Sequence, residues 1–263
     1  MSTPLTREQL LQTHFDAFHT ARAKSPFVSR LYAEALGDAY PAEVAAYSSC
    51  DWPLLGTLVG RLCLRPGQVL ADLGCGTGGV GLWLARALDV HLLGVDISPA
   101  AVRLAEARAA RFVSTARAVF TVGTLDATGL PDGQVHGAVC VDALSHATDR
   151  DTALHEIHRI LAPGGRAVFT RVVRIDACED WTDRAAGAGL RVEHVDERPD
   201  EPSMWHRLYE LWLHHEPGLR QELGDAQADN MLREAHRMLP VLNERRALVM
   251  TLQRPPDSPD RVA

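Results

Sequence analysis

Apolar positions follow two different periods along the middle of the chain. Short apolar runs rich in β-branched residues predict strands at 69–73, 91–96, 118–123, 135–141, 166–173 and 190–195. Between them, apolar residues recur at helical spacing and predict helices at 80–88, 98–112, 152–161 and 179–188. Strands that alternate with helices in this way predict an α/β fold, in which helices cover both faces of a parallel sheet.

Helical patterns also flank this alternating region. Before it, the spacing predicts helices at 6–23, 27–36 and 52–63, the first opened by the capping-box pair Thr6 and Gln9 and the third by Asp51 as N-cap. After residue 198, helices at 201–216 and 219–239 precede a last strand at 246–253. We therefore expect a helical cap at 1–64, a core at 65–198, a helical lid inserted at 199–244, a final core strand at 245–254 and a flexible tail at 255–263.

A glycine-rich loop follows the strand predicted at 69–73. Gly74, Gly76, Gly78 and Gly79 can adopt positive φ, and without a Cβ they allow a ligand to approach the backbone N–H groups. The spacing G-x-G-x-x-G also satisfies the dinucleotide-binding fingerprint, and Asp96 lies near the place where an NAD enzyme binds the ribose hydroxyls. An NAD-dependent oxidoreductase is therefore one hypothesis.

Further features favour a different cofactor. Asp72 precedes the first glycine by two positions. Four motifs, the first of which contains Asp72, occur in this order along the chain: Ala71-Asp-Leu-Gly-Cys-Gly-Thr-Gly78, Gly94-Val-Asp-Ile-Ser98, Leu130-Pro-Asp-Gly133 and Leu161-Ala-Pro-Gly-Gly165. With these motifs, roughly residues 60–198 resemble the class I S-adenosylmethionine-dependent methyltransferases. The flanking helices and the late insertion resemble the small-molecule branch of natural-product pathways.

The resemblance implies a Rossmann-like sheet of seven strands, mostly parallel with the last strand antiparallel, that binds S-adenosylmethionine. It assigns Asp96 to the ribose hydroxyls, the backbone of residues 74–78 to the methionine end and the ribose, and Asp72 to the ordering of the loop. Asp72 has a structural alternative, which is to cap the following helix.

The adenine contact is open between two residues. Related sequences commonly have Gly-Asp after the third strand, whereas this chain has Gly123-Thr-Leu-Asp126. Either Thr124 or Asp126 then binds the adenine amino group, and Leu125 offers its backbone N–H to the ring. The cofactor-binding residues predicted in this way are Asp72, Gly74, Cys75, Gly76, Gly78, Asp96, Ile97, Thr124, Leu125, Asp126 and Val141.

Candidate catalytic residues follow the fourth strand. In the fold that the chain resembles, the loop from Asp142 to His146 lies beside the departing methyl group. His146 is a candidate general base, since the pKa of an unperturbed histidine is near neutral. Its alternative is a loop histidine that packs or contacts the cofactor. Asp142 is expected to position groups or contact the cofactor more than to act as a base.

Aromatic residues supply the candidate acceptor site. Trp205, Tyr209 and Trp212 lie at i, i+4 and i+7 on the first helix of the insertion, with His206 beside them. Such a stripe either forms a core or stacks on a flat acceptor. Tyr47 and Trp52 in the N-terminal cap are similar candidates.

Composition and charge exclude other classes. The net charge of −7 and the scattered basic residues argue against nucleic acid and anionic membranes as partners. Five cysteines without C-x-x-C spacing indicate neither a disulfide framework nor a zinc site, and no metal is expected. Because no apolar run approaches the length of a membrane span, we expect a cytoplasmic protein. We expect it to be either a monomer or a homodimer.

The leading hypothesis is a methyltransferase that acts on a small acceptor, aromatic and indole- or phenol-like, by in-line transfer. Few obligatory catalytic residues are needed for such a transfer, because alignment and exclusion of water do much of the work. The alternatives are the NAD-dependent oxidoreductase and a protein that binds S-adenosylmethionine without methylating, such as a cyclase or a binding protein.

Overall fold

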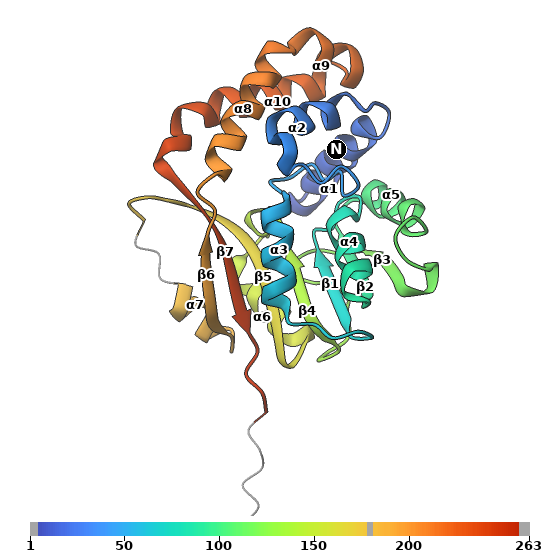
Figure 1. Ribbon diagram of the computed structural model, residues 1–263, viewed down its shortest axis with the longest axis vertical. Coiled ribbons are helices and arrows are strands. Elements are labelled where there is room, and N and C mark those ends of the chain that lie inside the picture. The colour runs from blue at the N-terminus through green and yellow to red at the C-terminus, as the bar shows by residue number, and fades with distance from the viewer. Residues whose placement is uncertain (1–4, 178–180, 258–263) are drawn as a thin grey trace, which may run out of the picture.

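A seven-stranded sheet forms the centre of the computed structural model, which describes residues 5–177 and 181–257 (Figure 1). The strands are β1 (Val69–Leu73), β2 (His91–Asp96), β3 (Ala118–Val122), β4 (Val135–Cys140), β5 (Leu161–Arg174), β6 (Arg191–Glu197) and β7 (Arg245–Gln253), in the order β3-β2-β1-β4-β5-β7-β6. β7 runs antiparallel to β5 and β6, whereas β1 to β5 pair in parallel. The predicted α/β fold with an antiparallel last strand is confirmed.

Helices cover both faces of the sheet. On one face, α3 (Trp52–Leu62), α4 (Gly79–Leu88) and α5 (Pro99–Ala109) pack in one core with strand residues such as Leu70. On the other face, α6 (Arg150–Ile160) and α7 (Trp181–Gly187) pack in a second core with Ala71 and Phe169. Consecutive residues Leu70 and Ala71 point to opposite faces, as the period of a strand requires, and this explains why the central strands are apolar throughout.

A separate layer of helices lies over the end of the sheet that carries the glycine loop (Figure 1). It combines α1 (Arg7–Arg22) and α2 (Phe27–Leu36) with the insertion helices α8 (Glu201–His214), α9 (Glu216–Leu223) and α10 (Asp225–Met238). α2 shares a third apolar core with α8 and α10, to which Leu31, Leu208 and Met231 belong. Segments from the two ends of the sequence thus form one cover over the strand ends.

Two differences from the sequence prediction change an element, whereas other ends are shifted by up to three residues, as at α5, which ends at Ala109 where residue 112 was expected. The helix expected at 219–239 is two helices, because Gly224 adopts φ 81° between α9 and α10. β5 begins at Leu161, where the sequence predicted a helix end and a turn, since Leu161 already pairs with Val135 of β4. Residues 179–180 of the helix predicted at 179–188, Cys178 and residues 258–263 of the predicted tail lie outside the described residues.

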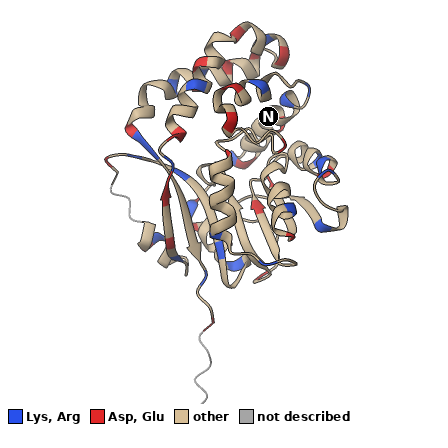
Figure 2. Ribbon diagram, in the orientation of Figure 1, with Lys and Arg blue, Asp and Glu red and all other residues tan. Residues whose placement is uncertain are grey.

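Charged residues of both signs are interspersed along the helices and strands (Figure 2). Within residues 5–177 and 181–257, no helix combines the length and the apolar character that a membrane crossing needs. Cys50, Cys75 and Cys140 are buried and Cys63 is exposed, and all four are free thiols.

Candidate functional site

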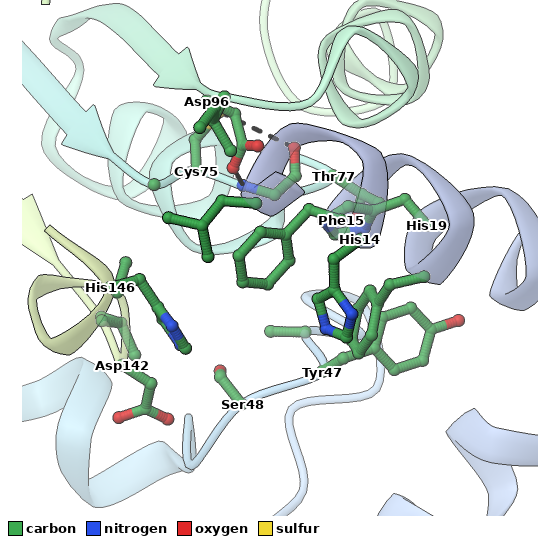
Figure 3. Close-up of a pocket in the computed structure, with 18 of the residues that line it drawn as sticks. His14, Phe15, His19, Tyr47, Ser48, Cys75, Thr77, Asp96, Asp142 and His146 are labelled. Atoms are coloured by element: carbon green, nitrogen blue, oxygen red, sulfur yellow. Dashed lines mark hydrogen bonds between the residues drawn. The ribbon is translucent and has the colours of Figure 1, made fainter. Parts of the chain in front are cut away.

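A cavity of about 690 Å³ lies between the sheet and the helical layer. Its lining combines the glycine loop and the ends of β2 and β4 with side chains from α1, α8 and α10. Figure 3 shows Asp96 and Cys75 on one side, Asp142 and His146 on another, and Phe15 of α1 beside them. The cavity therefore joins the predicted cofactor loop to the predicted acceptor helix.

The glycine loop is fixed by hydrogen bonds to β2 and its end. The N–H groups of Gly74 and Cys75 both donate to the carbonyl of Val95, at 2.8 and 3.0 Å. Asp96 accepts from the N–H of Gly76 at 2.8 Å with one oxygen and from the N–H of Ser98 at 2.9 Å with the other. Burial raises the pKa of Asp96 above its usual value, and the two backbone donors act against that rise. The carboxylate thus faces the cavity from a rigid position.

The glycines serve different purposes. At Gly74, with φ 73°, a Cβ would lie 2.3 Å from the Cβ of Ala143, so the loop needs glycine to pass the segment after β4. At Gly78, with φ 74°, a Cβ would press on Phe120 and Ala105. Gly74, Cys75 and Gly76 line the cavity, whereas Gly78 does not. Gly78 therefore allows the loop to pack closely against Ala105 and Phe120, and its contact with a cofactor stays a prediction.

Asp72 also lies outside the cavity lining. Its side chain is 2% exposed and accepts from the N–H of Gly81 at 2.9 Å, in the first turn of α4. Burial raises the pKa of Asp72 to about 7, and the bond from Gly81 lowers it. Asp72 thus ties β1 to the start of α4 across the glycine loop, and its part in cofactor binding stays a prediction.

The segment after β3 lines the cavity with Thr124, Leu125 and Asp126, and Ile97 lines it from the end of β2. Asp126 accepts from the backbone N–H groups of Thr148 and Asp149 with Oδ2, at 3.1 and 3.4 Å. Its Oδ1 is buried and has no hydrogen-bond partner in the part of the chain that is described. The hydroxyl of Thr124, in contrast, already accepts from the N–H of residue 127 at 3.0 Å.

Asp142 connects the end of β4 to the N-terminal region. It has a left-handed conformation, with φ 57°, and follows Val141, which also lines the cavity. Its carboxylate accepts from the N–H and the hydroxyl of Ser49, at 2.6 and 3.1 Å, and from the hydroxyl of Thr170, at 2.7 Å. Arg198 in turn donates to the hydroxyl of Ser49 at 2.7 Å and to its carbonyl at 2.5 Å. Asp142 therefore holds the loop that carries Tyr47 beside β4.

His146 lies on the short 3₁₀ turn Leu144–His146 and lines the cavity. Its ring meets the ring of Phe15 edge-on, with centroids 5.1 Å apart. Burial lowers the pKa of His146, the charge of His14 lowers it further, and Asp142 raises it. The imidazole is therefore neutral at pH 7 and is able to accept a proton.

The predicted acceptor residues separate into two groups. Tyr47, Trp205 and Trp212 line the cavity. Tyr209 is buried but donates to Glu234 at 3.0 Å, and it lines a smaller neighbouring cavity of about 450 Å³.

Trp52 and His206 lie away from the large cavity. Trp52 is 40% exposed and packs on Trp83, and His206 is exposed and lies 3.4 Å from Glu210 on the same helix. The structure therefore does not bring these two predicted acceptor contacts to the large cavity.

The sequence reasoning missed the contribution of α1. His14, Phe15, Phe18, His19 and Arg22 all line the cavity. The helical spacing of Phe15 and Phe18 is typical of an apolar face, but spacing alone does not tell whether such a face covers a core or a cavity.

Among residues 5–177 and 181–257, no three His, Cys, Asp or Glu side chains are grouped so that they could hold a metal ion.

Comparisons with known proteins agree with this geometry. Residues 70–165 match the family model of a methyltransferase domain. An O-methyltransferase of Pyrenophora dematioidea is 28% identical over 154 residues, which are 59% of this chain and 51% of that protein. The 27-O-demethylrifamycin SV methyltransferase of Amycolatopsis mediterranei is 31% identical over 153 residues, which are 58% and 54%. The chain thus spans about half the length of the curated relatives it matches.

Solved structures resemble nearly the whole chain. The crystal structure of the [4+2]-cyclase SpnF has a TM-score of 0.75 and 20% identity, and the match covers 97% of this chain and 98% of that one. A phosphoethanolamine N-methyltransferase of Haemonchus contortus, solved with S-adenosylhomocysteine, has a TM-score of 0.70 and 15% identity and covers 97% and 61%. At these identities the likeness shows the fold. Together with the family match, it agrees with the resemblance that the motifs predicted: residues 70–165 match a methyltransferase domain, and the chain has the fold of the class I methyltransferases.

Proposed function

We propose that this protein transfers the methyl group of S-adenosylmethionine to an oxygen of a small, largely apolar acceptor, with an aromatic hydroxyl compound of the phenol or indole type as the expected class. The observation that carries the proposal is the single cavity of about 690 Å³ that extends from the glycine loop past His146 to Trp205 and Trp212. The relatives named O-methyltransferases support oxygen as the methylated atom.

The residues at the glycine-loop end fit this donor. Each oxygen of Asp96 accepts one backbone N–H and keeps capacity for a further bond, which suits a ribose diol. The partnerless Oδ1 of Asp126 would accept from the adenine amino group as a carboxylate oxygen, which is a stronger acceptor than the hydroxyl of Thr124. These observations favour Asp126 over Thr124. Bound there, the donor supplies an electrophilic methyl group.

The protein has two tasks in such a transfer. It aligns the acceptor oxygen with the methyl group and excludes water, to which α1 contributes by covering the cavity. It also takes the proton that the acceptor hydroxyl loses. His146 suits this role, because burial keeps its ring neutral and Phe15 packs against it.

The aromatic end of the cavity suits a flat acceptor. Trp205, Trp212, Tyr32 and Tyr47 line it, and their rings can stack on an acceptor ring. The Nε1 of Trp212 is buried and has no hydrogen-bond partner among the described residues. Arg22, Asn230 and Glu234 line the cavity as well, so aromatic molecules that carry a few polar groups fit it best.

Calorimetry with S-adenosylhomocysteine tests the donor half of the proposal. Wild-type protein should bind it, and Asp96→Ala should weaken binding about ten- to a hundredfold, the range for lost hydrogen bonds to a charged group. Asp132→Ala is the matched control, since Asp132 is exposed and pairs with Arg159 away from the cavity. Absence of binding to the wild-type protein would overturn the proposal.

A non-methylating cyclase is the second candidate. The observation in its favour is that the likeness to the [4+2]-cyclase SpnF extends over 97% of this chain, including the helical layer. A turnover assay separates the two functions: a methyltransferase releases one S-adenosylhomocysteine for each acceptor converted, whereas a cyclase converts its substrate and releases none.

A further inference from the structure

Arg22, near the end of α1, is a buried arginine in the wall of the cavity. Arg22 is 4% exposed, and it lines the same cavity as the glycine loop, Trp205 and Trp212. An ionised group is costly to bury unless a counter-charge or several hydrogen bonds compensate it. The contacts of Arg22 therefore indicate whether a partner is missing.

The guanidinium of Arg22 has little compensation within the chain. One nitrogen donates to the carbonyl of Phe18, one turn earlier, at 3.4 Å, and Nε is buried without a partner in the described part of the chain. Its other support is the ring of Phe18, whose centroid lies 3.5 Å from Cζ, with the ring of Tyr47 at 5.7 Å. Burial lowers the pKa of Arg22 to about 10, so the group stays charged at pH 7.

Two carboxylates of the cavity are held by other groups, and one of them, Glu234, acts on Arg22 through its charge without forming an ion pair with it. Glu234 accepts from the hydroxyl of Tyr209, and Asp142 accepts from Ser49 and Thr170. Among the ion pairs of the described residues, none includes Arg22. A guanidinium presents a fork of N–H donors that matches a carboxylate in two-point geometry.

We propose that Arg22 is the binding residue for a carboxylate carried by a ligand in this cavity. Two ligands could bring such a group: the methyl donor, through its amino-acid carboxylate, or an acceptor that carries an acid function. In either case a carboxylate supplies the charge and the acceptors that the guanidinium lacks. The inference rests on the proposed function only for the use of a donor analogue as one of the two probes.

Calorimetry with paired probes tests the assignment in Arg22→Met and in the wild type. S-adenosylhomocysteine has the amino-acid carboxylate, whereas 5′-methylthioadenosine lacks the amino-acid part. Benzoate and benzamide, measured with S-adenosylhomocysteine present and absent, form the second pair. Arg30→Met is the matched control, because Arg30 is an exposed arginine that lies over the ring of Phe27.

If the carboxylate is the donor's, Arg22→Met weakens S-adenosylhomocysteine about ten- to a hundredfold and leaves 5′-methylthioadenosine unchanged. If it is the acceptor's, the substitution removes the preference for benzoate over benzamide instead. Arg30→Met should change neither. Unchanged binding of both acids in Arg22→Met would overturn the proposal, as would a lower melting temperature as its only effect.

Two further measurements keep the outcome readable. If Arg22→Met does not fold, Arg22→Lys retains the charge and the stem but loses the two-point geometry, so a smaller loss for the same acid is expected. If the wild type fails to bind S-adenosylhomocysteine, the proposed function fails, while benzoate against benzamide still tests Arg22. An absent benzoate preference in the wild type, together with unchanged S-adenosylhomocysteine binding in both variants, refutes the carboxylate site.

Discussion

Asp142 is expected to stabilise the fold through the contacts that hold the N-terminal loop against β4. Its carboxylate accepts two bonds from Ser49 and one from Thr170, while the residue itself has a φ of 57°. Substitution by alanine removes all three bonds and leaves the buried backbone N–H of Ser49 without an acceptor. It also places a β-carbon in the left-handed region without the local hydrogen bonding that helps Asp adopt it.

The magnitude follows from these contacts. A hydrogen bond to a charged group contributes about 1.5–3 kcal/mol, and left-handed alanine costs about 1–2 kcal/mol. Since Asp142 is only partly buried, the lower values apply to its three bonds and its backbone, and Asp142→Ala should reduce the free energy of unfolding by about 5.5 kcal/mol. Asp142→Gly loses the same bonds without the backbone penalty and should be about 1 kcal/mol more stable than Asp142→Ala.

Urea unfolding, followed by far-ultraviolet circular dichroism, measures these differences from the midpoints at constant slope. Asp142→Asn keeps one carbonyl oxygen and should fall between wild type and Asp142→Ala. Asp126→Ala serves as a comparison, because Asp126 bonds only to a neighbouring loop. A loss below about 1 kcal/mol for Asp142→Ala, or a glycine variant less stable than the alanine variant, would refute the reasoning.

Three further predictions concern protonation and the adenine contact. His146→Ala should reduce kcat about 10²- to 10⁴-fold. In the wild type the acid limb of the pH profile of kcat/KM should lie below pH 6.5, because a base with a lowered pKa is protonated only at lower pH. The same acid limb in His146→Gln would contradict this role of His146. Burial lowers the pKa of His19 from 6.5 to about 4, so the unfolded chain binds a proton before the folded chain does as the pH falls. The free energy of unfolding should therefore drop by about 3 kcal/mol between pH 6.5 and pH 4. Parallel urea titrations of His19→Gln give the reference, which lacks this drop. Asp126→Asn should weaken S-adenosylhomocysteine at least tenfold by calorimetry and Thr124→Val should not, and the reverse result would assign the adenine to Thr124.

The central fold could be predicted from the sequence because its signals are local. Each strand is an apolar run and each helix on the sheet has its own periodic pattern, so the order of elements follows from residues close together in sequence. The two boundary errors have tertiary causes. Gly224 lies between two helical patterns, and an isolated glycine is compatible with one helix or two. Leu161 looked like a helix end, but its pairing with Val135 makes it the start of β5.

The candidate site divides in the same way. Asp96 and the glycines form a loop between consecutive elements, and their spacing alone indicated a ligand. Trp205 and Trp212, seven residues apart, line the cavity as hypothesised. Tyr209, between them, belongs to the same stripe but is turned toward α10, where Glu234 accepts its hydroxyl. Only the position of α10, which the sequence did not specify, separates these three aromatic side chains.

The proposed donor end and the proposed acceptor end of the cavity are built from different parts of the fold. The donor end depends on backbone N–H groups and on Asp96, whose positions follow from the ends of β1 and β2. The proposed acceptor end is formed by side chains of α1, α8 and α10, and of these helices α8 and α10 pack with α2 in a core of their own. Because the two ends rest on different cores, substitutions in the helical layer can reshape the acceptor end while the sheet keeps the donor end unchanged. The same separation explains why the family could be read from residues 70–165 while the acceptor could not.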